Sequence, residues 1–241
     1  MRVLVPPGSA AGALWAVGQR VSLDKDEAHH LRVRRAREDE GVEILDGAGL
    51  VGTGRLVRVG AEWMVDIQTA ERRTRHPELT LAVAAGDRER FYWMAEKAVE
   101  LGATVILPLD TERTAGVASR FRPDHVGKLR RLVLEATKQC GAAWAPSVEL
   151  PVPLMEFTTQ RIAGQGWLAD SSGALPPASL DQTPLTVVVG PEGGLTDGER
   201  TLLLTSGYQP IRLGSNTLRF ETAALAAAAA AMAARMRGDH G

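Results

Sequence analysis

The feature that most constrains the fold of this chain is a change of sequence pattern near residue 75. Before it, short β-branched or alternating runs are separated by glycines and charged turns, which is typical of a small β-barrel. These predicted strands are Val3–Val5, Arg20–Leu23, Val42–Leu45, Gly54–Val59 and Trp63–Ile67. One short helix is expected over Glu27–Arg35, with Asp24 or Asp26 as its cap.

After residue 75, continuous apolar runs alternate with segments of helical spacing, which predicts a mostly parallel sheet covered by helices. The predicted strands are Leu79–Ala85, Thr104–Pro108, Gly166–Ala169, Leu185–Val189 and Ile211–Leu213. The predicted helices are Arg88–Leu101, Pro123–Cys140, a helix from the capping box Thr196–Glu199 to Gly207, and Glu221–Arg237. The polar segment Arg72–Pro77 serves as a linker, so we expect two domains, residues 1–71 and 76–241.

Composition excludes several classes of protein and of site. The chain of 241 residues has a single cysteine, Cys140, so it forms no internal disulfide and no cysteine-rich zinc site. The histidines have no metal-binding spacing, so no metal is expected. The longest apolar run, Ala223–Ala234, is too short to span a bilayer. No leader pattern opens the chain, and a cytoplasmic protein without membrane contact is expected.

The charges point to a local anionic partner. The net charge of −1 argues against nucleic-acid binding over the whole surface. However, Arg32, Arg34, Arg35 and Arg37 lie within six positions, and residues 113–138 hold seven basic and two acidic side chains. Such clusters suit phosphate groups, although a solvated basic surface explains them about as well.

One glycine-rich motif is misleading. Residues Gly47–Gly52 match the dinucleotide-binding pattern G-x-G-x-x-G, which requires a helix directly after it. The following segment, Thr53–Val59, instead has the pattern of a strand. The sequence therefore favours a glycine-rich hairpin over the site of an NAD-dependent oxidoreductase.

Two later loops are better candidates for a ligand site. Gly190–Gly194 leaves a buried strand and enters a capped helix, the place where parallel sheets bind ligands. The carboxylate of Glu192 would repel a phosphate, and it suits a cation or a ribose hydroxyl. The second loop, Leu213–Ala223, carries Arg219 and Glu221, which could also form a simple local ion pair. A tight turn without a ligand remains the alternative for the first loop.

Taken in order, these motifs resemble the RsmE family of small-subunit ribosomal RNA methyltransferases, which belongs to the SPOUT class. The matching positions outside the two loops are Glu96, Lys97, Glu100, Gly102, Pro108, Thr111, Glu112, Arg113, Glu135, Ala136, Gln139 and Pro146. Near the N-terminus, His29, His30, Leu31, Arg34, Arg35 and Leu45–Gly47 resemble that family's PUA-like RNA-binding domain.

The resemblance implies a PUA-like β-barrel followed by a SPOUT α/β domain with a C-terminal trefoil knot, in a homodimer. The implied reaction uses S-adenosylmethionine to methylate uridine N3 in the 16S ribosomal RNA of the small ribosomal subunit. The implied catalytic residues are Arg219 and Glu221. The implied cofactor-binding residues are Ala169, Val189, Gly190, Glu192, Gly193, Gly194, Leu213, Gly214, Ser215 and Leu218. The implied RNA-binding residues are Arg2, Arg32, Arg34, Arg35, Lys97, Arg113 and Lys138.

Some positions depart from the family pattern. Asn216 and Ala142 stand where relatives often carry arginine, and Ala169 and Asp170 end a strand that often ends in a His or Glu pair. Each change removes a possible RNA or cofactor contact. They leave open an alternative in which the chain is a non-catalytic RNA-binding protein with a degenerate methyltransferase domain.

Overall fold

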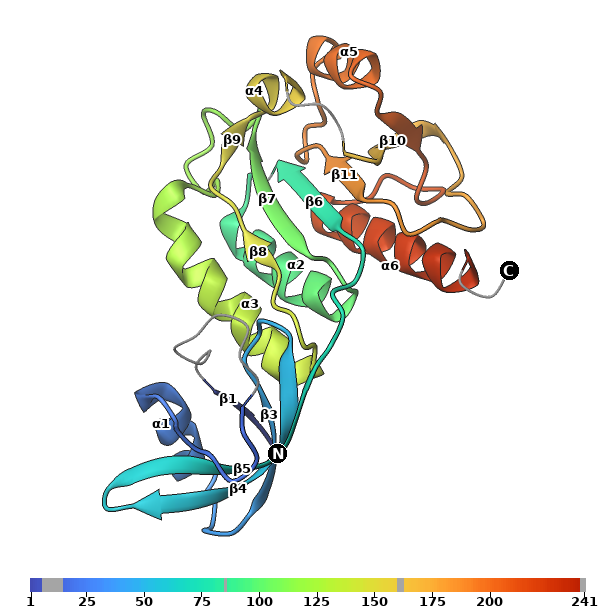
Figure 1. Ribbon diagram of the computed structural model, residues 1–241. Helices are drawn as coiled ribbons and strands as arrows, with labels where there is room; N and C mark the ends of the chain where they lie inside the picture. Colours follow the sequence, from blue (N-terminus) through green and yellow to red (C-terminus); the bar gives the residue numbers. More distant parts are fainter. Residues whose placement is uncertain (6–14, 85, 160–162, 239–241) are drawn as a thin grey trace. The chain divides into compact units, whose positions relative to one another are not determined.

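The computed structural model describes residues 1–5, 15–84, 86–159 and 163–238 (Figure 1). The chain divides into two compact units. The first consists of Met1–Arg75 together with Leu134–Ala145, and the second of His76–Val133 together with Pro146–Gly241. The first unit therefore takes in a later segment that the sequence pattern assigns to the second domain.

The first unit is built on a five-stranded sheet. Its elements are β1 (Arg2–Leu4), β2 (Arg20–Ser22), α1 (Lys25–Val33), β3 (Gly41–Leu45), β4 (Leu50–Val59) and β5 (Glu62–Arg72). The strand order is β1-β3-β4-β5-β2, with β1 parallel to β3 and the other pairs antiparallel. The side chain of Asp24 caps α1 by accepting a hydrogen bond from the Glu27 amide at 2.8 Å.

The strands predicted in this part of the sequence are confirmed, but two are longer than expected. β4 begins at Leu50 and β5 continues to Arg72, because the two strands pair along nearly their whole length. Thr53 and Thr69 are paired across this ladder, and their hydroxyls lie 2.8 Å apart. The Gly47–Gly52 motif lies in the β3–β4 hairpin, and no helix follows it. This geometry rules out the dinucleotide site.

The second unit is a parallel sheet with helices (Figure 1). Its strands are β6 (Leu79–Ala84), β7 (Val105–Asp110), β8 (Ser147–Val148), β9 (Val152–Pro153), β10 (Gln165–Ala174), β11 (Leu185–Val189) and β12 (Gln209–Ile211). Their order is β12-β10-β11-β6-β7-β8, and β9 also pairs with β7. Its helical elements are α2 (Arg88–Glu100), the 3₁₀ turn η1 (Pro123–His125), α3 (Val126–Cys140), α4 (Leu154–Thr159), α5 (Asp197–Thr205) and α6 (Phe220–Gly238). Only the first part of α3 belongs to this unit.

Helices pack on both faces of this sheet. Ala82, Ala84 and Val188 form one buried cluster with Phe157 of α4 and Leu203 of α5. Alternate residues of a strand point to the opposite face. There α6 packs against β6 and β11, and α2 packs against α6. The alternating pattern of the sequence therefore predicted the layers of this unit correctly.

Most differences from the predicted elements are small, but β10 continues to Ala174, beyond the predicted end of that strand at Ala169. The strand predicted over Leu79–Ala85 ends at Ala85, which lies outside the described residues. The last strand is Gln209–Ile211 rather than Ile211–Leu213. β8, β9 and α4 were not predicted, because strands of two residues and a helix of six residues carry too little periodic signal. None of the helices in the described ranges is long and apolar enough to cross a membrane.

The alanine-rich helix α6 is anchored near its end by a buried arginine. Arg235 is 3% exposed and donates hydrogen bonds to the carbonyl oxygens of Pro77, Glu78 and Thr183. Burial lowers the pKa of Arg235 from its ordinary value. The small side chains of α6 let it lie close to the sheet, and Arg235 ties it to the start of β6.

Candidate functional site

A cavity of about 390 Å³ opens in the second unit where β10 and β11 part. The two strands pair as far as Leu168 and Val188, and β10 then continues beside β12 alone. The walls of the cavity come from the ends of these strands, the loops that follow them and the first turn of α6. The predicted cofactor residues in its lining are Ala169, Val189, Gly190, Glu192, Gly194, Leu213, Gly214 and Leu218.

The structure thus brings both glycine-rich loops to one cavity, as the sequence predicted. The other two predicted residues, Gly193 and Ser215, adjoin lining residues but are not part of the described lining. Further lining residues outside the predicted cofactor-binding set include Asp170, Arg200, Thr217, Phe220 and Ala223.

The loop after β11 is a tight turn that leads into α5. Gly194 has a φ of +73°, a conformation that side chains disfavour, and its amide donates to the carbonyl of Pro191 at 2.7 Å. The predicted capping box is present: the Thr196 amide donates to Glu199 Oε2 at 2.9 Å, and the Glu199 amide donates to Thr196 Oγ1 at 3.3 Å.

Two side chains join this turn to the loop after β7. Glu199 is buried, and its Oε1 accepts a hydrogen bond from the Glu112 amide at 2.9 Å. Arg113 donates through Nη1 to the carbonyl oxygen of Gly193. The sequence pointed to Arg113 as an RNA contact, but here its guanidinium supports the loop that follows β11.

An ion pair at the cavity was missed by the sequence analysis. Arg200 Nε lies 2.6 Å from Asp170 Oδ2, and Arg200 Nη2 donates to Ser172 Oγ at 3.1 Å. Burial by itself would raise the pKa of Asp170, but hydrogen bonds from Ser172 and Arg200 outweigh it and hold that pKa below its ordinary value. Asp170 and Arg200 are distant in sequence, so no local pattern indicates the pair.

The two predicted catalytic residues occupy different surroundings. Arg219 is exposed, whereas Glu221 is buried in the first turn of α6. Glu221 pairs with Arg90 of α2, whose Nη1 lies 3.9 Å from Glu221 Oε1. Within the described residues, no ion pair joins Arg219 to Glu221, so the simple local pair is not formed.

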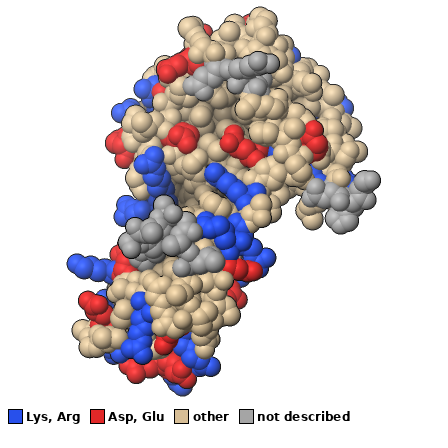
Figure 2. Space-filling view, in the orientation of Figure 1, with Lys and Arg blue, Asp and Glu red and all other residues tan. Residues whose placement is uncertain are grey.

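The predicted RNA-binding residues divide into two groups. Arg32, Arg34 and Arg35 are exposed on or just after α1. Arg2 instead contacts Glu43 at 2.7 Å and the carbonyl of Gln139 at 2.6 Å, both within the first unit. Lys97 contacts Glu96 at 3.1 Å and Glu100 at 2.9 Å. Basic and acidic side chains are interspersed over the face shown in Figure 2.

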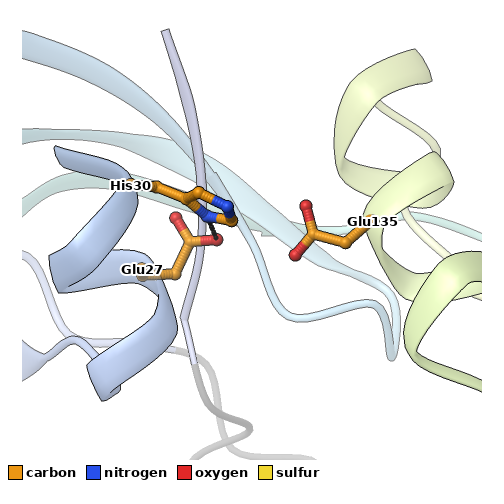
Figure 3. Close-up of side chains that lie close together, drawn as sticks. All are labelled: Glu27, His30 and Glu135. Atoms are coloured by element: carbon orange, nitrogen blue, oxygen red, sulfur yellow. Dashed lines mark ion pairs between the residues drawn. The ribbon is translucent and has the colours of Figure 1, made fainter. Parts of the chain in front are cut away.

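Lys138 is also engaged within the protein. Glu27 and His30 of α1 and Glu135 of α3 lie together in the first unit, as Figure 3 shows, with ligand atoms within 4.8 Å of one another. The ammonium of Lys138 bonds to Glu27 and lies 2.9 Å from Glu135 Oε2. Because the Lys138 ammonium already pairs with both carboxylates of the cluster, we assign no metal site to it, and Lys138 is a weaker candidate for a phosphate contact.

Comparison with known proteins identifies the class first. Residues 74–232 match the model of a family described as the RNA methyltransferase domain, and residues 23–62 match the RNA methyltransferase PUA domain. The class that fold and cavity define is therefore that of the RNA methyltransferases.

Individual relatives identify the family within this class. The chain is 32% identical over 214 residues to ribosomal RNA small subunit methyltransferase E of Synechocystis, covering 84% of this chain and 69% of that protein. It is 28% identical to the protein of the same name from Rickettsia conorii, over 93% of each chain. The crystal structure of the Neisseria gonorrhoeae methyltransferase E bound to S-adenosylmethionine superposes with a TM-score of 0.82 at 27% identity, covering 95% of each chain. The chain belongs to the ribosomal RNA small subunit methyltransferase E family.

Proposed function

We propose that this protein transfers a methyl group from S-adenosylmethionine to N3 of a uridine in the 16S ribosomal RNA of the small subunit. The observation that carries the proposal is the cavity where β10 and β11 part, with both glycine-rich loops in its wall. The similar structure from Neisseria gonorrhoeae contains S-adenosylmethionine, and the relatives are named for the small-subunit RNA.

The residues around the cavity fit this cofactor. A volume of about 390 Å³ is within the range of small-molecule sites. Leu168, Leu218 and Phe220 offer apolar surface to an adenine ring, and the glycines expose backbone groups for hydrogen bonds. The carboxylates of Asp170 and Glu192 suit ribose hydroxyls, an ammonium or a sulfonium. When bound, S-adenosylmethionine supplies the methyl group on its sulfonium.

The chain's own residues would then bring the acceptor into line. Uridine N3 carries an imide proton and is a poor nucleophile until that proton leaves. Arg219, exposed just before α6, can stabilise the negative charge that grows on O2 and O4. A carboxylate such as Glu221 can help the proton to depart. A paired target base must first be turned out of its helix.

The RNA backbone would be held by arginines. The exposed group Arg32, Arg34 and Arg35 is the main candidate for phosphate contacts, which position the protein without reading sequence. Arg2, Lys97, Arg113 and Lys138 are secondary candidates, since each already has a partner in the protein. A ribosomal substrate places the enzyme in the cytoplasm.

We also propose three finer features of the molecule. The first unit closes into a PUA-like barrel, the end of the second unit forms a trefoil knot, and the protein acts as a homodimer. The resemblance to the family supports all three. A crystal structure tests the barrel and the knot through the path of the chain. Light scattering during gel filtration tests the dimer.

The test of function is methyl transfer from labelled S-adenosylmethionine to small ribosomal subunits that lack this modification. Free 16S RNA and large subunits serve as controls. N3 methylation blocks Watson–Crick pairing, so reverse transcription should stop one base before the target uridine. Label in the small subunit with one new stop supports the proposal. Absence of both label and cofactor binding would favour the non-catalytic RNA-binding protein.

Arg219→Ala separates catalysis from binding in the same assay. Because Arg219 is exposed and is not part of the described cavity lining, the variant should lose methyl transfer far more than cofactor affinity. An equal loss of both would make Arg219 a cofactor-binding residue instead.

A further inference from the structure

A tryptophan from the segment after α3 lies against the glycine-rich hairpin of the first unit. The amide of Gly49 donates a hydrogen bond to the carbonyl oxygen of Ala143 at 2.9 Å. The amide of Ala145 donates one to the carbonyl oxygen of Gly47 at 2.8 Å. Trp144 stands between these two bonds, so the backbone pairing fixes its place on the hairpin.

Gly49 makes room for the indole ring. A Cβ at position 49 would lie 2.6 Å from Cε2 of Trp144, which is too close for two carbon atoms. The φ of Gly49 is +99°, a conformation that side chains disfavour. The indole Nε1 donates to the carbonyl oxygen of Arg73 at 3.0 Å and so orients the ring. The glycine-rich motif that lacks the geometry of a dinucleotide site thus serves to seat this indole.

Arg75 lies over the same ring. Its guanidinium carbon is 5.6 Å from the centre of the Trp144 ring, within the range of a cation–π contact. Arg75 is exposed and Trp144 is half-buried, so a partner can reach this pair from solvent. Aromatic rings and guanidinium planes are the two kinds of flat surface on which unpaired nucleobases stack.

The charge around this pair is positive. Arg72 is exposed, and its Nη1 donates to the carbonyl oxygen of Ala48 at 3.1 Å. Ala48 in turn forms a β-bridge with the tryptophan. Arg73 pairs with Glu71 at 2.5 Å. Within the described ranges, neither Arg72 nor Arg75 forms an ion pair, so both charges are available to phosphate groups.

We propose that Trp144 and Arg75 form a stacking platform for an unpaired nucleobase, and that the charges of Arg72 and Arg75 attract the phosphates beside it. The occupant is single-stranded RNA, because a double helix keeps its bases stacked inside and shows mainly its backbone. An acidic protein surface would use the charges but not the ring. The inference rests on the proposed function, and it names an RNA-binding site outside the arginines of α1.

A second arginine–tryptophan pair in the same unit provides a matched comparison. The guanidinium carbon of Arg58 lies 5.3 Å from the centre of the Trp63 ring. However, Trp63 is only 6% exposed and belongs to the buried core of this unit. The contact is of the same kind but offers no accessible ring, so we expect no base to stack there.

The experiment measures the affinity of the whole protein for two RNA probes by fluorescence anisotropy at several salt concentrations. One probe is a single-stranded uridine oligonucleotide, and the other is the same strand annealed to its adenosine complement. Trp144→Leu should lower the affinity for the single strand about 10-fold, because it removes one stacked base. It should leave the affinity for the duplex unchanged. The dependence of affinity on salt should also stay the same, since no charge is lost.

Three further variants separate ring, charge and structure. Arg75→Gln should lower the slope of log affinity against log salt for the single strand by about 0.7, the value for one phosphate contact. Arg58→Gln is the control and should change neither slope nor affinity. Trp144→Phe keeps a ring and loses only the indole bond to Arg73, so it should retain most of the affinity.

Three results would overturn the inference. They are an unchanged single-strand affinity in Trp144→Leu, an equal loss for both probes, and a wild-type protein that binds no single strand. If Trp144→Leu does not fold, photocrosslinking of a 5-iodouridine strand to the wild type decides. Attachment at Trp144 supports the platform, and attachment only elsewhere refutes it. All these readouts report binding, so a failure of methyl transfer to small subunits is seen separately.

Discussion

Replacing Lys138 by methionine removes the ammonium that neutralises a buried carboxylate in the first unit. The side chain of Glu27 is 4% exposed, and that of Lys138 is 14% exposed. Their ion pair joins α1 to the last turns of α3. Glu135 shares the same ammonium at 2.9 Å, but its side chain is 46% exposed. Methionine keeps most of the length and apolar surface of lysine, so the variant tests the charge rather than the packing.

The expected loss of stability arises because the substitution leaves the buried Glu27 carboxylate without its cation. Breaking a buried ion pair costs about 3–5 kcal/mol, because one charge remains without compensation. The exposed Glu135 adds less than about 1 kcal/mol. His30 Nδ1 lies 3.8 Å from Glu27 Oε1, so the carboxylate keeps one polar neighbour when the ammonium is removed. We therefore expect the free energy of unfolding of the first unit to fall by about 3 kcal/mol.

The assay is hydrogen–deuterium exchange in rising urea, read from peptides of each unit separately. Peptides of the second unit provide an internal reference. Lys97→Met is the matched control, because Lys97 also pairs with two glutamates but its side chain is 35% exposed. It should leave the stability of the second unit nearly unchanged, because the ion pairs of a solvent-exposed lysine contribute little. The double variant Glu27→Gln with Lys138→Met should recover much of the loss, since it buries no charge.

The pH dependence gives a further check. Burial by itself would lower the pKa of Lys138, but hydrogen bonds to Glu27 and Glu135 outweigh it and raise the pKa above its ordinary value. A raised pKa in the folded state contributes stability that is full below the ordinary lysine pKa and is lost above it. The wild type should lose its advantage over Lys138→Met only above about pH 10.4. A single variant as stable as wild type, or a double variant no better than the single, would refute the reasoning.

Three further predictions concern the cavity. Arg113→Ala should weaken cofactor binding about 10-fold in calorimetry, because the Gly193 carbonyl loses a charged donor, worth about 1.5–3 kcal/mol; unchanged affinity would contradict this. Gly194→Ala should lower the midpoint of thermal unfolding, since a side chain at φ +73° costs about 1–2 kcal/mol. Wild-type protein should keep the Asp170–Arg200 pair well into acid, because the lowered pKa of Asp170 gives stability that is lost only as pH falls through the folded value. Carbon-13 NMR of labelled Asp170 would report that titration directly, and a midpoint above the ordinary aspartate value would contradict it.

Periodicity predicted the elements that bury a regular face. The continuous apolar run Leu185–Val189 is β11 without a shift, and helical spacing located α2 to within one residue. The capping box of Thr196 and Glu199 was predicted correctly, because it depends only on residues three positions apart. Local sequence carries such features, and the glycine loops could be placed at one edge of the sheet for the same reason.

Pairings between distant residues could not be predicted. Asp170 and Arg200 meet because β10 continues past β11 and α5 begins beside it, which no local pattern encodes. Arg219 was the expected ion-pair partner of Glu221, but in the structure Glu221 pairs with Arg90 of α2. Lys138 was predicted to contact RNA, but its ammonium pairs with Glu27 inside the first unit. A sequence shows where charge lies along the chain but not which charge neutralises it.

The lining of the cavity has an evolutionary consequence. Every described lining residue falls between Leu168 and Ala223, so one short stretch of the gene encodes the whole wall. The exposed arginines proposed for RNA contact lie far upstream, around α1. Mutations that change how tightly RNA phosphates are held can therefore accumulate in the early part of the gene while the donor pocket stays intact. RNA affinity can therefore change in a lineage while every ancestor keeps its ability to bind the methyl donor.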